Sequence, residues 1–78
     1  MEDPKEIIAR NIVDLRRKNG MTQLELAEKL NYTDKAVSKW ERGESIPDVA
    51  VLKTIADLFG VTVDYLLTAE HKTTVPVL

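Results

Sequence analysis

Residues 22–43 read TQLELAEKLNYTDKAVSKWERG, and this stretch decides the fold. Thr22 is followed by Glu25 at the spacing of a capping box, which satisfies two backbone N–H groups at the start of a helix. Apolar residues then recur at helical spacing until Asn31, which tolerates the left-handed conformation that ends many helices. After a three-residue turn, a second helix is predicted over residues 34–42. This spacing is typical of a helix-turn-helix.

Three further helices are predicted outside this stretch from their capping residues and apolar spacing. They cover residues 4–18, 49–59 and 63–67, and no convincing strand accompanies them. We therefore predict an all-α fold of five short helices, with one domain over residues 1–68 and a tail or linker over residues 69–78. In the fourth helix, the predicted apolar face consists of Val49, Leu52, Ile55, Ala56 and Phe59.

The composition limits the class of protein. With 78 residues, 44% of them hydrophobic, the chain suits one small globular domain. The absence of cysteine excludes a disulfide framework and a thiolate metal site. No apolar run approaches the roughly 20 residues that cross a membrane, and the acidic start does not resemble a signal peptide. We expect a soluble, cytoplasmic protein without a cofactor or metal.

The net charge of −2 is unusual for a protein that binds nucleic acid, but the charges are unevenly distributed. Residues 1–43 hold nine basic and eight acidic groups, whereas residues 44–78 hold two basic and five acidic groups. Any surface that binds an anion is therefore expected in the first part of the chain. Non-specific affinity for nucleic acid should be modest.

The helix over residues 34–42 has two distinct faces. Ala36, Val37 and Trp40 form an apolar face, while the opposite face is polar and basic. A helix on the surface of any protein has a polar face, so this pattern alone does not indicate a ligand. In a recognition helix, however, the N-terminal part of such a face points at the base edges of DNA. The predicted base-contacting residues are Thr33, Asp34, Lys35, Ser38 and Lys39.

The start of the preceding helix supplies a second feature that favours DNA. Its capped N-terminus leaves backbone N–H groups pointing outward at the positive end of the helix dipole, where a phosphate can bind. Gln23 is the side chain best placed to help hold that phosphate. A site for the DNA backbone would then adjoin a site for the bases.

These residues resemble those of the lambda/434 repressor and Cro-type helix-turn-helix regulators (the XRE family). The resemblance rests on QLELAEKL at residues 23–30 and VSKWERG at residues 37–43, and it covers about residues 5–68. It implies a lambda-repressor-like domain that acts as a homodimer on a two-fold operator in double-stranded DNA, with the third helix in the major groove. We expect such a protein to regulate transcription as a repressor.

The resemblance also implies roles for particular residues. Arg16 and Glu41 match a structural ion pair that ties the first helix to the end of the third, and Val61 and Val63 fall in the expected dimer interface. The chain departs from the family pattern at Asn31, where Gly is usual, and at Glu44, where a basic residue is common. The expected phosphate-contacting residues are Thr22, Gln23, Arg42 and Ser45.

Other readings of individual residues are less specific. Trp40 is expected in the core because of its place beside Val37. His71 lies in the tail, so Ser38 has no partner for nucleophilic catalysis and an enzyme is not expected. The acidic second part of the chain leaves two alternatives open. One is a protein-interaction module that has lost DNA binding, and the other is an antitoxin; an anti-repressor could also be a partner.

Overall fold

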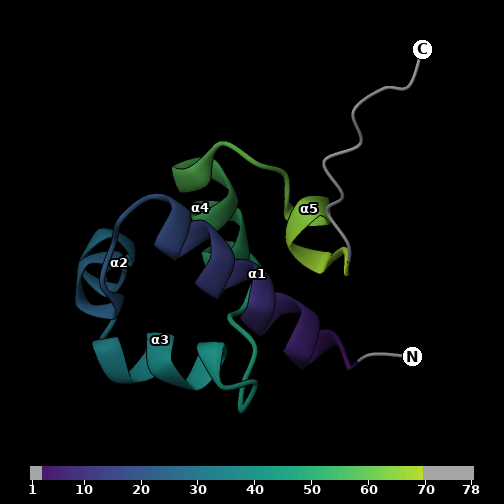
Figure 1. The fold of residues 1–78 in the computed structure, drawn as a ribbon, viewed down its shortest axis with the longest axis horizontal. Coiled ribbons are helices and arrows are strands. Elements are labelled where there is room, and N and C mark those ends of the chain that lie inside the picture. Colours follow the sequence, from purple (N-terminus) through teal and green to yellow (C-terminus); the bar gives the residue numbers. More distant parts are fainter. Residues whose placement is uncertain (1–2, 70–78) are drawn as a thin grey trace.

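The computed structural model describes residues 3–69 and folds them into five helices, with no strand among the described residues. Helix α3 packs against both α1 and α2, and α5 packs against α1 and α4 (Figure 1). The predicted all-α fold is therefore confirmed, and the predicted tail lies mostly outside the described residues. The helices are α1 (Pro4–Lys18), α2 (Gln23–Leu30), α3 (Asp34–Glu41), α4 (Val49–Phe59) and α5 (Val63–Leu67).

Each helix begins where the sequence provides a capping side chain. A side-chain oxygen of the residue before each helix accepts a hydrogen bond from a backbone N–H of its first turn. Helices α2 and α4 end at Asn31 and Gly60, which have φ angles of 63° and 69°. Asn31 thus adopts the left-handed conformation that the sequence predicted for the end of this helix. The capping residues are Asp3, Thr22, Thr33, Asp48 and Thr62.

One hydrophobic core lies between the helices, and every helix contributes to it. Trp40 is 5% exposed and belongs to this core, as predicted, with its ring centroid 5.4 Å from that of Tyr32. Further core residues with no more than 2% exposure are Ile8, Ile12, Leu26, Ala27, Val37, Ile55, Ala56 and Leu66.

The predicted apolar face of α4 is wrong at its first position. Val49 is 78% exposed, and Val51 is buried in its place. The buried face is centred between Leu52 and Ile55, so at 3.6 residues per turn Val49 lies roughly 90° away from that centre. It is also the first residue of the helix, where no further turn covers it.

Asn11 joins the first helix to the last. It is 6% exposed, and its Nδ2 donates to the carbonyl oxygens of Tyr65 (3.4 Å), Leu66 (2.8 Å) and Thr68 (3.0 Å). These carbonyls lie at the end of α5, where a helix runs out of backbone N–H groups to bond them. The Tyr65 carbonyl also accepts from the Thr68 N–H, at 3.2 Å. A single side chain of α1 therefore caps a helix of five residues.

Replacing Asn11 with Ala should lower the free energy of unfolding by about 1–3 kcal/mol, because buried carbonyl oxygens lose their donor. Urea denaturation followed by circular dichroism measures this change. Asn19→Ala is the matched control, because Asn19 is exposed and donates only within its own helix end, to the Leu15 carbonyl. Equal stabilities of the Asn11 and Asn19 variants would contradict this role of Asn11.

Candidate nucleic-acid interface

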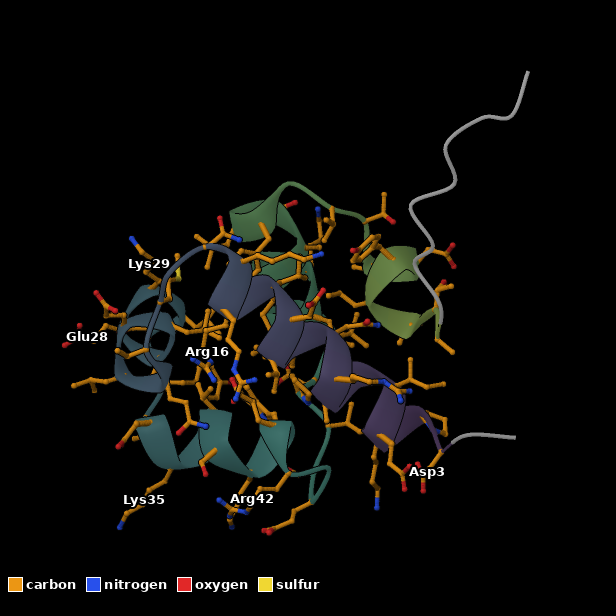
Figure 2. The ribbon with its side chains drawn as sticks, viewed as in Figure 1. Asp3, Arg16, Glu28, Lys29, Lys35 and Arg42 are labelled. Carbon is orange, nitrogen blue, oxygen red and sulfur yellow. The ribbon has the colours of Figure 1, made fainter. Side chains whose placement is uncertain are left out.

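A shallow hollow lies where the start of α2 meets the outer face of α3. Of the nine residues predicted to contact DNA, six line it, and they include both lysines of the α3 face. Figure 2 shows Lys35 and Arg42 extending from the side of α3 that faces away from α1. The lining residues are Gln23, Asp34, Lys35, Ser38, Lys39 and Arg42.

The other three predicted contact residues lie outside this lining. Thr22 and Thr33 cap helices, so their side-chain oxygens accept hydrogen bonds from the N–H groups of Glu25 and Ala36. Each hydroxyl still keeps a proton that can be donated to an anion. Ser45 is half-buried in the segment that follows α3.

A buried ionic cluster fixes the position of this hollow on the domain. Arg16 Nε donates to Glu41 Oε2 at 2.6 Å, and Arg16 Nη2 donates to Glu41 Oε1 at 3.0 Å. The side chains are 12% and 6% exposed, respectively. The hydrogen bonds to Glu41 raise the pKa of Arg16 above its usual value, although burial opposes this change. Helices α1 and α3 are thus joined by a two-bond pair at the place the sequence predicted.

The same cluster extends to α2. Gln23 Nε2 donates to Glu41 Oε1 at 2.9 Å, and Arg16 Nη1 donates to the carbonyl oxygen of Met21 at 2.8 Å. Gln23 is the first residue of α2, and Met21 lies two residues before it. Glu41 therefore orients the side chain that the sequence assigned to a phosphate, a link that sequence reasoning did not foresee.

The N-terminus of α2 is partly satisfied by the chain itself. Its capping box is complete, because Glu25 accepts from the Thr22 N–H at 2.8 Å and donates its own N–H to Thr22 Oγ1 at 3.0 Å. Hydrogen bonds from Thr22 to the Glu25 carboxyl, above all from the Thr22 backbone N–H, lower the pKa of that carboxyl. The N–H groups of Gln23 and Leu24 precede the first intrahelical bond, from Leu26 N–H to the Thr22 carbonyl, so neither has a partner within the helix.

At the other end of α3, Arg42 is engaged by the protein. Its Nε lies 2.6 Å from Glu44 Oε2, its Nη2 lies 3.2 Å from Glu44 Oε1, and its Nη1 donates to Ser38 Oγ. This contact raises the pKa of Arg42 and lowers that of Glu44. Sequence reasoning treated Arg42 and Ser38 as separate DNA contacts and missed this link, for which the only signal was Glu44 in place of a basic residue.

The predicted dimer residues have a structural role in the single chain. Val61 lies just before α5, and Val63 is its first residue. Both are half-buried and pack against the core, so only part of each side chain is available to a partner. Within residues 3–69, no helix combines the length and apolar content needed to cross a bilayer.

A profile of the helix-turn-helix family matches residues 12–66, which include all of α2, α3 and α4. The chain belongs to this family. Among its relatives, the HTH-type transcriptional activator BcrR of Enterococcus faecalis is 44% identical over 57 residues, 73% of this chain. Those residues make up 28% of BcrR, so the chain spans about a quarter of that relative.

The solved structures that share this fold include a transcriptional repressor and an enzyme. The SOS-response transcriptional repressor LexA from Eubacterium rectale has a TM-score of 0.84 at 26% identity, over 97% of this chain and 83% of that one. Hydroxypropylphosphonic acid epoxidase from S. wedmorenis has a TM-score of 0.78 at 26% identity, over 87% of this chain. The match covers only 36% of the epoxidase chain, so the likeness is to one part of that enzyme.

Replacing Glu41 with Ala should destabilise this helix-turn-helix domain by about 3 kcal/mol, because Arg16 then remains as an unpaired, mostly buried charge. Thermal and urea unfolding measure the loss. Asp57→Ala removes the partner of an exposed pair, Lys53–Asp57 at 3.6 Å, and should cost less than about 1 kcal/mol. A Glu41 variant as stable as the Asp57 variant would contradict the structural role of the buried pair.

Proposed function

We propose that this chain binds double-stranded DNA in a sequence-specific manner and regulates transcription. The observation that carries the proposal is the hollow between α2 and α3. Two exposed lysines and short polar side chains on α3 stand there beside Gln23, the first residue of α2. The α3 side chains suit the base edges of the major groove, and Gln23 suits a phosphate.

The chemistry of each side chain indicates which part of the DNA it would contact. Lys35 and Lys39 lie about one turn apart on α3 and suit acceptors such as guanine O6 and N7, while Asp34 suits the amino group of cytosine. Gln23, fixed by Glu41, suits a backbone phosphate together with the α2 N-terminus. The remaining proposed contacts are Thr22, Thr33, Ser38, Arg42 and Ser45.

We further propose that the protein acts as a homodimer and as a repressor. A dimer with exposed parts of Val61 and Val63 at its interface would place two copies of α3 on a two-fold operator. Relatives and structural neighbours include both a named activator and a named repressor. Repression is favoured because occupation of a promoter by DNA binding alone can block transcription.

Selection from a random double-stranded DNA library at moderate salt tests the proposal directly. We expect enrichment of a two-fold sequence whose half-sites lie about one helical turn apart. A single asymmetric half-site would keep DNA binding and refute the dimer. No enrichment from protein that is folded by circular dichroism would refute DNA recognition and favour the protein-interaction module.

Replacing Lys35 or Lys39 with Ala should weaken binding to the selected site by about 1–3 kcal/mol and relax the base preference at one or two positions. Fluorescence anisotropy with the selected site and single-base variants measures both effects. Lys53→Ala makes the same change of charge on α4, outside the hollow, and should leave the base preference unchanged. If the α3 variants keep the base preference of the parent, α3 does not read the bases.

A further inference from the structure

Glu44 holds the one arginine of the hollow in an arrangement that resembles binding to a phosphate. Two guanidinium nitrogens of Arg42 face the two carboxylate oxygens of Glu44, at 2.6 and 3.2 Å. Two parallel N–H···O bonds of this kind are also how arginine binds a phosphate of the DNA backbone. The carboxylate of Glu44 therefore occupies the same donors that the DNA backbone would use.

The pair is placed where it can open. The Arg42 and Glu44 side chains are 53% and 51% exposed, and ion pairs at such exposure contribute little to stability. Because Gly43, between them, has a φ of 72°, the chain turns back and brings Glu44 to the end of α3. The contact is local to three residues, so breaking it requires no change in the helices.

Arg42 also engages Ser38, through the bond from Nη1 to Ser38 Oγ. The Glu44 carboxylate thus restrains Arg42, which is proposed to contact the DNA backbone, and through it Ser38, which is proposed to contact the bases. By contrast, the buried Glu41 binds Arg16 and Gln23, and it lies outside the lining of the hollow. Glu44 also lies outside that lining, but it bonds Arg42 within it, so its removal would free Arg42 without disturbing the Glu41 cluster.

We propose that Glu44 acts as an intramolecular competitor of DNA phosphate for Arg42. This inference rests on the proposed function, because it assigns a regulatory role within the same DNA-binding site. In the free protein, Arg42 is neutralised by Glu44; on the operator, its guanidinium exchanges the carboxylate for a phosphate and releases Ser38. The competition lowers affinity for all DNA and keeps non-specific binding weak.

The test is a double-mutant cycle on the full chain, with fluorescence anisotropy on the selected operator at several salt concentrations. Glu44→Gln should tighten binding about threefold to tenfold at 0.1 M salt, because the neutral amide competes poorly with phosphate. The plot of log affinity against log salt should become steeper, because only the parent must also open an ion pair, which salt weakens. In an Arg42→Gln background, the same Glu44 substitution should leave affinity almost unchanged.

The cycle separates competition from the general effect of removing a negative charge. Glu28→Gln removes an acidic group that extends outward from the side of α2 (Figure 2), outside the lining of the hollow, and should change affinity less than twofold. If Glu44→Gln raises DNA affinity by the same factor in the parent and in the Arg42→Gln background, the effect is one of general charge and the proposal is overturned. The proposal is also overturned if the Glu44→Gln variant binds the operator no more tightly than the parent does.

Failure of the proposed function would appear differently. If neither the parent nor any variant binds DNA, the proposed function is refuted and this inference with it. If the parent binds and Lys35→Ala weakens that binding, DNA recognition stands, and the Glu44 cycle alone decides whether Arg42 is held by an internal competitor.

Discussion

The Arg16–Glu41 pair is the contact on which the arrangement of the helix-turn-helix depends. Its two short bonds join α1 to α3, and the bond from Gln23 to the same carboxylate joins α2. Apolar packing alone permits helices to slide or rotate, whereas a buried charge requires its partner at bonding distance. The cluster therefore fixes the relative positions of the α2 N-terminus and the outer face of α3, and the proposed interface is built from those two elements.

Local sequence accounts for most of the fold because the helices are short and carry their own start and stop signals. The five capping residues and the left-handed Asn31 act within a few residues, so the sequence alone placed the helix boundaries to within one residue; α3 ends at Glu41, and Arg42, predicted as its last residue, is the C-cap. The error at Val49 has a different origin. Periodicity shows that α4 has an apolar face, but the rotation of that face by a fraction of a turn depends on the neighbouring helices.

The candidate site could be predicted as a set of residues, but its internal bonds could not. Helical spacing places Lys35, Ser38 and Lys39 on one face, and the structure keeps them there. The contact between Arg42 and Glu44 depends on the backbone turn at Gly43, and the one between Gln23 and Glu41 depends on how two helices pack. Asn11 was missed for the same reason, although a polar residue on an apolar stripe was a signal that could have found it.

The bonds from Asn11 to the end of α5 join residues separated by 54 to 57 positions in the chain. The helices themselves are local and can form early, but the domain closes only when its last helix reaches its first. During synthesis, the side of α1 that carries Asn11 therefore stays uncovered until the residues up to Thr68 have been made and α5 can pack against it. The time for which the nascent domain exposes this side of α1 is thus set by the arrival of α5.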